Sequence, residues 1–463
     1  MRVCQLKLSQ FRNYHELDLH PGEGINILYG DNAQGKSNVL EAISLLATTR
    51  SLRASRESEL IFRDAEVANV NAEVGRDREG DVELQVSVFQ GDKKAVRVNG
   101  LKRPRVVDLL GEFNAVFFGS IDLAIVTGEP TDRRHYMNVE ISQISPRYVY
   151  DLGHYKRALA QRNRVLRDLR DRPRPPESSG IEAWNEQLVT FGSTLFDKRR
   201  FYTERLAPLA DQIHRELTEG RESLELRYMP SIVLPPAAPP ANDEKKENNL
   251  ARESREERYL ADTRETAGES SGESLVQTAP QKPLSGAEAI AAAFRAQLTA
   301  IGSEEARRGT TLLGPQRDDI CLFINGMDAR LYGSQGQQRT VALALKLAEF
   351  RLIEDYVGEP PVMLLDDVMS DLDDQRRNHL LQWVRRRCQT FITCTNLRSF
   401  PKEILAEAAT FHVANGIITA DGKRKSKHSA RAYAHPLQPA EERETAETGA
   451  SEPAPEQSAV VGT

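Results

Sequence analysis

The chain has 463 residues, of which 28% are charged, and its formal net charge is −6. Residues 241–285 and 436–463 together hold sixteen acidic and eight basic residues, so the other 390 residues carry a formal charge of +2. The acidic balance therefore does not exclude a nucleic-acid partner, whereas the lack of any apolar run of about 18–20 residues and of a signal-peptide pattern excludes a membrane-embedded protein and predicts a cytoplasmic one.

The first hundred residues are predicted to be mostly strands. Alternating apolar residues predict a hairpin over about 3–19, and residues 25–29 read as a short buried strand. Apolar residues at helical spacing then predict a helix over about 38–46. Further strands are expected at 67–74, 82–89 and 96–98, with Asn99-Gly100 as a tight turn.

The middle of the chain changes to a helical pattern. Apolar residues recur every three, four or seven positions from about 133 to 220, interrupted by the Pro-rich residues 172–176, which predicts a long helical hairpin or a helical bundle. Residues 234–285 are rich in Pro, Ser and charge, and we expect a disordered insertion there. A helix is predicted to resume over 286–301.

The last part returns to strands around one long helix. Strands are predicted at 310–313, 320–324, 362–365 and 391–393, and a helix at about 335–356. The pattern indicates an α/β protein whose sheet is interrupted by a helical arm and then completed. The expected parts are an N-terminal head segment at 1–125, the arm at 126–300, a C-terminal head segment at 301–420 and a disordered tail at 421–463.

The loop after the buried strand at 25–29 matches G-x-x-x-x-G-K-[ST]. Its residues are Gly30, Asp31, Asn32, Ala33, Gln34, Gly35, Lys36 and Ser37. Such a loop turns a row of backbone N–H groups towards a phosphate chain, at the positive end of the following helix. Lys36 would reach the β- and γ-phosphates of ATP, and the Ser37 hydroxyl would ligate Mg²⁺. The alternative, an incidental glycine turn, does not explain why a buried strand precedes the loop and an apolar helix follows it.

A second motif is an apolar strand that ends in Asp366 and Asp367. Two adjacent carboxylates repel each other, so this strand end suits a cation. Asp366 would hold Mg²⁺ directly or through water, and Asp367 would orient or deprotonate an attacking water. A solvated strand end remains the alternative for this motif taken alone.

The third motif, Ser334-Gln335-Gly336-Gln337-Gln338-Arg339, precedes the long apolar helix. Ser334 is a good N-cap, which is the simplest explanation of its position. Gly336 and the glutamines exceed what capping needs, and small residues let a phosphate approach a helix N-terminus. A second anion site in a chain with a P-loop suggests a nucleotide held between two subunits.

These motifs, in this order, resemble an ABC-type ATPase head of the SMC-like branch. Within that branch, blocks spread over residues 1 to about 400 are similar to the RecF family of bacterial recombinational-repair proteins. The blocks are residues 8–14 (LSQFRNY), 50–53 (RSLR), 161–163 (QRN), 314–319 (GPQRDD), 334–339 (SQGQQR) and 372–377 (LDDQRR). GPQRDD and SQGQQR together are the specific part, although Gln316 stands where the family pattern has His.

The resemblance implies a function. It implies an ATP-dependent homodimer that binds double-stranded DNA near gaps and single-strand junctions, helps load recombinase with RecO and RecR, and is a slow, DNA-stimulated ATPase. ATP and Mg²⁺ are the implied cofactors. By motif, Ser334, Gly336 and Gln337 would contact the partner subunit's nucleotide, with Ser334 and Lys36 assisting Asp367 in hydrolysis. Arg12 would lie near the nucleotide, and residues 370–373 would cross the interface.

The DNA contact has weaker support in the sequence. Residues 147–174 hold nine Lys or Arg against three Asp, which attracts phosphate without reading bases. The alternative is a solvated helix face. Basic residues at 50–56 and 102–105 are further candidates, and no alternation of basic and aromatic residues typical of single-strand binding is visible.

Two other classes of protein remain open. The nucleotide-binding subunit of a membrane transporter has the same type of head, but the long arm and the absence of a switch histidine after the strand at 391–393 disfavour it. A P-loop kinase would leave residues 334–339 unexplained. The histidines form no catalytic set, and Cys4, Cys321, Cys388 and Cys394 have no metal-binding spacing and are expected to be reduced and buried.

Overall fold

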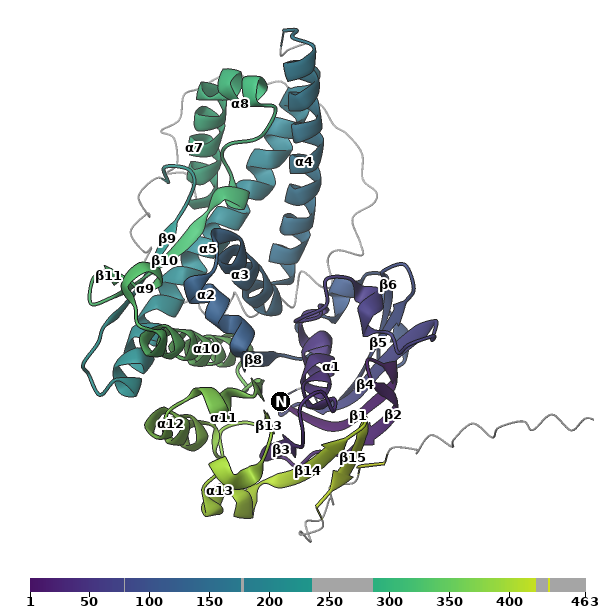
Figure 1. Ribbon diagram of the computed structural model, residues 1–463. Coiled ribbons are helices and arrows are strands. Elements are labelled where there is room, and N and C mark those ends of the chain that lie inside the picture. The colour runs from purple at the N-terminus through teal and green to yellow at the C-terminus, as the bar shows by residue number, and fades with distance from the viewer. Residues whose placement is uncertain (79, 176–178, 235–285, 422–431, 434–463) are drawn as a thin grey trace, which may run out of the picture.

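The computed structural model describes residues 1–78, 80–175, 179–234, 286–421 and 432–433. An α/β head forms the lower part, and a helical arm rises from it (Figure 1). The expected disordered insertion at 234–285 and tail at 421–463 lie almost entirely outside these residues. Within them, no helix is both long and apolar enough to cross a membrane.

The central sheet of the head is built from both ends of the chain. Its order is β15-β14-β3-β13-β12-β8, and neighbours pair in parallel except β14 and β15. The strands are β3 (Ile25–Tyr29), β8 (Ala115–Gly119), β12 (Val362–Asp366), β13 (Thr390–Cys394), β14 (Ala409–Ala414) and β15 (Ile417–Ala420). The apolar runs of β3, β8, β12 and β13 are buried on both faces, as parallel strands require, whereas β14 and β15 at one edge are only partly buried. The predicted sheet, interrupted and then completed, is confirmed.

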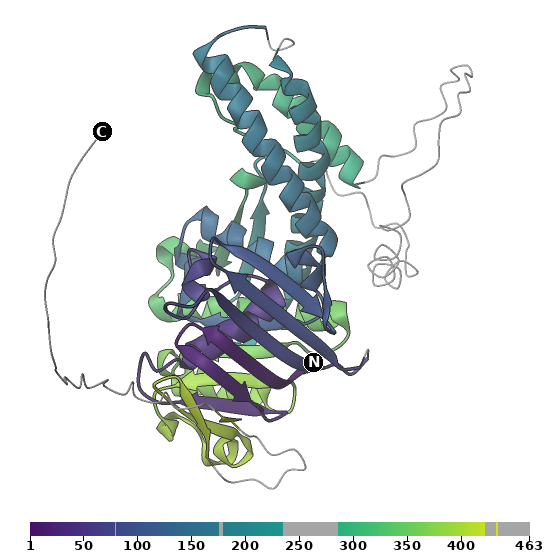
Figure 2. The same cartoon turned by 90° about the vertical axis from the view of Figure 1, so that its right-hand side faces the viewer.

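A second, antiparallel sheet covers one side of the head and faces the viewer in Figure 2. Its order is β16-β2-β1-β4-β5-β6-β7. The strands are β1 (Arg2–Phe11), β2 (Tyr14–Leu19), β4 (Val67–Gly75), β5 (Val82–Phe89), β6 (Lys93–Val98), β7 (Leu101–Lys102) and β16 (Ala432–Tyr433). Helix α1 (Lys36–Thr48) shares one apolar cluster with both sheets, so the helix after the P-loop is fixed from two sides.

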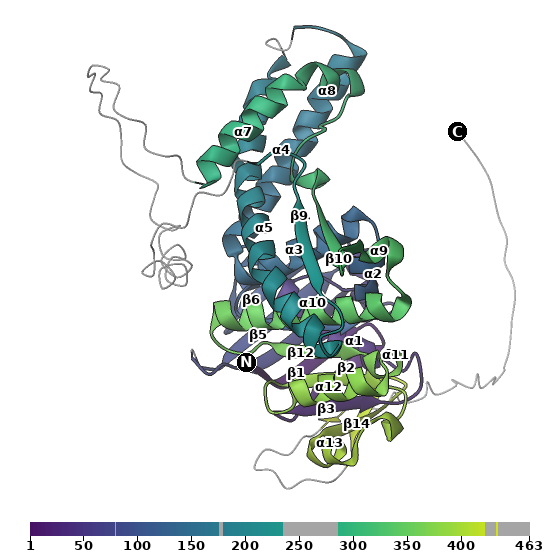
Figure 3. The same ribbon diagram turned by 90° about the vertical axis from the view of Figure 1, so that its left-hand side faces the viewer.

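The arm is the predicted helical hairpin. Helices α4 (Pro146–Asp171) and α5 (Ile181–Leu217) pack along each other, and α7 (Gly286–Ala300) and α8 (Gly302–Arg308) pack beside them (Figure 3). Two shorter helices, α2 (Leu123–Thr127) and α3 (Pro130–Ile144), connect the head to the arm. Ser145 caps α4 by accepting a hydrogen bond from the Tyr148 amide.

A three-stranded sheet, β11-β10-β9, lies at the base of the arm. Its strands are β9 (Leu224–Met229), β10 (Asp319–Ile324) and β11 (Met327–Asp328), so the predicted strand at 320–324 pairs here and not in the head sheet. The predicted strand at 310–313 is wrong. Its backbone is bound by side chains of the arm: the Thr311 amide donates to Asn163 Oδ1 at 2.8 Å and the Leu312 amide to Glu305 Oε1 at 2.7 Å.

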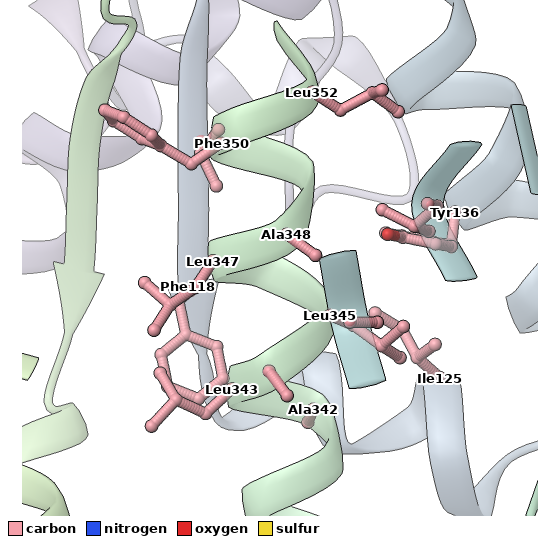
Figure 4. Close-up of a cluster of buried hydrophobic side chains, with 14 of the residues drawn as sticks. Phe118, Ile125, Tyr136, Ala342, Leu343, Leu345, Leu347, Ala348, Phe350 and Leu352 are labelled. Atoms are coloured by element: carbon pink, nitrogen blue, oxygen red, sulfur yellow. The ribbon is translucent and has the colours of Figure 1, made fainter. Parts of the chain in front are cut away.

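Helix α10 (Gln335–Val357) runs through the main core. Figure 4 shows Leu343 of this helix near Phe118 of β8 and Leu345 near Ile125 of α2, while Phe350 points to the other side of the helix. Lys346 is buried in the same region and pairs with Glu349 at 2.6 Å and Glu140 at 3.2 Å. The remaining helices are α9 (Ala329–Tyr332), α11 (Val368–Asp371), α12 (Asp374–Val384) and α13 (Lys402–Glu407), with 3-10 turns at Glu57–Leu60, Val106–Leu109, Ser120–Asp122, Pro315–Arg317 and Leu397–Ser399.

Candidate nucleotide-binding site

The P-loop and the acidic strand end meet at one edge of the central sheet. Strands β3, β13 and β12 are parallel neighbours, so their carboxyl ends at Tyr29, Cys394 and Asp366 lie side by side. Ligands of open α/β sheets bind at this edge. The sequence predicted both motifs, and the fold brings them together.

The backbone of the P-loop has the shape that a phosphate cradle needs. Gly30 and Gly35 have φ angles of 149° and 113°, and Ala33 has 64°. A Cβ on Gly30 would lie 2.3 Å from the Val413 carbonyl oxygen, and one on Gly35 would lie 2.5 Å from the Asn13 side chain. Glycine is therefore required at both ends of the loop, where the backbone turns and packs closely.

Lys36 is folded into the loop. Its Nζ donates to the carbonyl oxygens of Gly30 and Asp31, both at 2.7 Å. Partial burial lowers the pKa of Lys36, while Asp367 and Asp366 act in the opposite direction. The ammonium group is thus held by carbonyl oxygens of the loop, and an anion entering the loop would take over its hydrogen bonds.

Side chains and turns that the sequence analysis did not single out hold the loop in place. Asn13 donates to the Gln34 carbonyl at 2.9 Å, and the Tyr14 hydroxyl donates to the Gly35 carbonyl at 3.1 Å. From the β14–β15 turn, the Asn415 amide donates to Gln34 Oε1 at 2.6 Å. For Asn13 and Tyr14, the only signal in the sequence was their position inside the FRNY block, which did not indicate a role. Asn415 carried no signal.

Arg12 lies beside Asn13 in the turn between β1 and β2, but its side chain binds another partner. Its guanidinium makes two hydrogen bonds with Glu41 of α1, at 2.8 and 2.9 Å, and a third with the Glu59 carbonyl. It therefore joins β1, α1 and the following turn behind the P-loop. A direct contact between Arg12 and nucleotide stays a prediction.

The two carboxylates at the end of β12 have different surroundings. Asp366 accepts from Thr393 Oγ1 at 2.7 Å and pairs with Arg53 at 2.5 Å, so a cation already lies against it. Asp367 has a φ of 55°, and its amide donates to the same Thr393 oxygen at 2.9 Å. Partial burial, with Asp366 and Asp371 nearby, raises the pKa of Asp367. These are the properties expected of a cation ligand beside a carboxylate that can accept a proton.

The Ser334 motif lies apart from the P-loop. Ser334 caps α10 as predicted, and it does so through a capping box: its hydroxyl accepts from the Gln337 amide at 3.3 Å, and its own amide donates to the Gln337 side chain at 2.8 Å. Gly336 is exposed, with open space where a Cβ would be. Among the described residues, no hydrogen bond or ion pair joins 334–337 to 30–37. The two motifs therefore lie apart within one chain, and anion binding at each stays a prediction.

An arginine connects these two halves within one chain. Arg339 of α10 donates to the Asp371 carbonyl at 2.9 Å, and Asp371 ends the short helix that follows Asp367. Residues 370–373, predicted to cross a subunit interface, thus contact the Ser334 helix of the same chain. Their role between subunits stays a prediction.

The basic stretch of the arm is only partly available to a ligand. Arg157, Arg164 and Arg167 are exposed, but Arg162 is buried and binds Glu305 at 2.6 Å. Arg162 is therefore a structural residue, and its inclusion among the DNA-contacting candidates was wrong. The charge run alone could not show which side of the helix each arginine occupies.

The GPQRDD block also has a structural role, at the joint between arm and head. Asp318 accepts from Arg199 of α5 at 2.9 Å and from the Tyr228 hydroxyl at 2.5 Å, and Asp319 pairs with Arg133 of α3 at 2.7 Å. The Tyr155 hydroxyl donates to Gln316. This group, defined here as the arm joint, links α3, α4, α5 and β9.

Comparison with known proteins agrees with this geometry. The family described as RecF/RecN/SMC N terminal domain matches residues 2–419. A DNA replication and repair protein RecF from Oceanobacillus iheyensis is 37% identical over 418 residues, covering 90% of this chain and 100% of the relative. RecF from Symbiobacterium thermophilum is 38% identical over 425 residues, covering 91% and 99%.

Comparison with solved structures also finds similarity to RecF. One described as the recombination mediator protein RecF-ATP in the RecFOR pathway has a TM-score of 0.74 and 30% identity, and covers 91% of this chain and 97% of that chain. The fold and site define a P-loop ATPase head of the SMC type. Within that class, the chain belongs to the RecF family of DNA replication and repair proteins.

Proposed function

We propose that this chain is an ATP-controlled DNA clamp. Two copies close on two ATP molecules, and the closed dimer holds double-stranded DNA near gaps and single-strand junctions. The observation that carries the proposal is that one chain exposes a P-loop edge and, separately, the Ser334 end of α10, and among the described residues no hydrogen bond or ion pair joins 334–337 to 30–37. Two such incomplete sites are completed by a two-fold dimer.

Each residue of the composite site has a role. The loop from Gly30 to Ser37 would bind the ATP phosphates through its amides, with Lys36 exchanging its carbonyl partners for phosphate oxygens. Ser334, Gly336 and Gln337 of the second copy would bind the γ-phosphate. Mg²⁺ neutralises phosphate charge when bound, and Ser37 and Asp366 would hold it. The Arg53 guanidinium beside Asp366 supports a cation position there.

Asp367 would position and deprotonate the attacking water. Its carboxylate lies next to the cation position, and burial raises its pKa towards the range useful for a base. Hydrolysis then removes the γ-phosphate that joins the two copies, and the clamp loosens. Slow turnover, stimulated by DNA, suits a switch. Because linkage is reciprocal, DNA that binds the closed dimer better must also favour ATP binding.

The relatives support the proposed partners. RecF structures described as part of the RecFOR pathway support RecO and RecR as partners for loading recombinase. The proposed cytoplasmic location fits a DNA substrate. A transporter subunit is disfavoured by the RecF relatives and by the arm, whose exposed Arg157, Arg164 and Arg167 suit the phosphate backbone of DNA.

Fluorescence anisotropy of a labelled gapped duplex tests the proposal. The full-length protein is titrated with ATP, with ADP and without nucleotide, at one fixed salt concentration. We expect tight binding with ATP alone, and loss of this binding in Lys36→Ala. Equal binding in all three conditions would contradict control by nucleotide.

A further inference from the structure

The turn that follows the longest helix of the arm contacts the Ser334 motif. Helix α5 packs against α10, and residues 218–223 then lead from α5 into β9 (Figure 3). Glu222 lies in this turn and accepts a hydrogen bond from Gln337 Nε2 at 2.9 Å. Gln337 belongs to the end of α10 that is proposed to bind the γ-phosphate. The arm therefore reaches the composite site through one carboxylate.

This contact fixes the orientation of the Gln337 side chain. Its Oε1 accepts from the Ser334 amide at 2.8 Å, while its Nε2 donates to Glu222. A backbone amide can only donate a hydrogen bond and a carboxylate can only accept one, so a flipped Gln337 amide would lose both contacts. Glu222 therefore holds Gln337 in the one orientation that keeps the capping box of α10.

Glu222 is itself held by the arm. Its other carboxylate oxygen lies 3.1 Å from Nε2 of His214, a fully buried side chain in the last turn of α5. Burial, the largest influence, lowers the pKa of His214 despite the nearby Glu222 carboxylate, so the ring is neutral at pH 7. The Nε2 atom then carries the hydrogen and donates it to Glu222, and Nδ1 has no hydrogen-bond partner among the described residues. A continuous series of hydrogen bonds thus runs from α5 through Glu222 and Gln337 to Ser334.

The same turn makes a second contact with a segment expected to face the other copy. Glu219 Oε1 accepts from Gln375 Nε2 at 2.5 Å. Gln375 lies in the first turn of α12, directly after residues 370–373, which are predicted to cross the subunit interface. One turn of the arm therefore binds glutamines on both segments.

We infer that Glu222 is a positioning residue through which the arm orients the Ser334 motif for ATP hydrolysis. Glu222 itself would not touch the nucleotide. It acts through Gln337, at the helix end where the γ-phosphate bound by the second copy is proposed to lie. A group locked by a neighbouring hydrogen bond keeps such a site preorganised. The inference rests on the proposed function, since it assigns a support to one half of the composite site.

The test measures ATP turnover and ADP affinity separately, in the full-length protein with a gapped duplex. Glu222→Ala should lower kcat by about tenfold, because Gln337 loses a hydrogen bond to a charged group. ADP has no γ-phosphate and would need only the P-loop of one chain. Calorimetric titration should therefore give the wild-type affinity for ADP in the variant.

Further variants separate positioning from a structural role. Glu222→Gln keeps a side-chain oxygen that can accept from Gln337 Nε2, so its kcat should return to within about twofold of wild type. In the Gln337→Ala background, Glu222→Ala should cause no further loss, because the two residues act through one contact. The matched control is Glu225→Ala, which removes a half-exposed carboxylate of β9 that pairs with Arg227 and should leave kcat unchanged.

Several outcomes would overturn the inference. Wild-type kcat in Glu222→Ala would do so, as would an equal loss in Glu222→Gln or a further loss in the double variant. A fall in ADP affinity as large as the fall in kcat would make Glu222 a structural residue. Failure of the proposed function is seen separately, because light scattering would then detect no ATP-dependent dimer of the wild-type protein.

Discussion

The nucleotide edge of the head and the arm joint use charged residues in opposite ways. In the joint, Arg199 and Asp318 are 2% and 0% exposed, and the structure gives every charged atom of the pair a partner. At the edge, Lys36 is held by backbone carbonyls, and burial raises the pKa of Asp367. The joint is complete without a ligand, whereas the proposed site at the edge would be completed by ATP and a second copy.

This difference separates stability from function. Removing one partner of a buried ion pair leaves the other charged and unpaired, which is strongly destabilising. Removing a charge that is poised for a ligand leaves the folded state nearly unchanged or relieves repulsion. Substitutions in the two regions should therefore have nearly opposite effects on unfolding and on ATP turnover.

The largest effect on stability is expected for Arg199→Ala. The substitution leaves Asp318 buried without its cation and should lower the free energy of unfolding by about 3–5 kcal/mol. Denaturant unfolding measures the loss. The control Arg295→Ala removes an exposed pair with Glu186, at 2.8 Å, and should cost about 0–1 kcal/mol. Similar losses in both variants would show that the joint does not stabilise the arm.

The next largest effect is expected for Asp367→Asn. Loss of the proton acceptor should slow ATP turnover by about 100-fold or more, while ATP binding persists and the dimer accumulates. Because burial and the nearby Asp366 disfavour the charged form of Asp367, the melting temperature should stay unchanged or rise.

The matched control for that variant is Asp374→Asn. Its side chain is 90% exposed and, within the part of the chain that the structure describes, its ion pair is with Arg377 on the surface, at 2.9 Å. We expect wild-type turnover from it. Turnover by Asp367→Asn within a few-fold of wild type would assign the base elsewhere.

A smaller effect is expected for Asn13→Ala, which removes a support of the P-loop and leaves the loop itself intact. The lost hydrogen bond to the Gln34 carbonyl should weaken ATP binding by about fivefold. Calorimetric titration measures this affinity. The control is Asn69→Ala, which loses a hydrogen bond from Ser87 in the antiparallel sheet of the head. Equal weakening of ATP binding in both variants would refute a specific role for Asn13.

The sequence predicted what depends on local pattern. The P-loop, the strand before Asp366 and the cap at Ser334 are each contained in a few consecutive residues, and the arm helices follow from apolar spacing. What it missed depends on distant partners. The Thr311 backbone is bound by Asn163, 148 residues away, so a strand-like sequence formed no strand.

The sequence also could not predict the direction in which a side chain points from its helix. Arg162 and Arg164 are two residues apart in one basic run, yet one is buried against Glu305 and the other is exposed. Charge counts cannot separate them without the helix that packs against α4. The contact between the His154 and Phe191 rings was missed for the same reason, since Phe191 comes from α5.

The most direct test of the composite site is a mixing experiment with two inactive variants. Lys36→Ala has a defective P-loop and an intact Ser334 helix, and Ser334→Arg has the reverse. In a mixed dimer, one of the two sites combines the intact halves. An equimolar mixture should therefore recover about a quarter of wild-type ATP turnover, although each variant alone is inactive. No recovery on mixing, or full turnover by Ser334→Arg alone, would contradict a site shared between two copies.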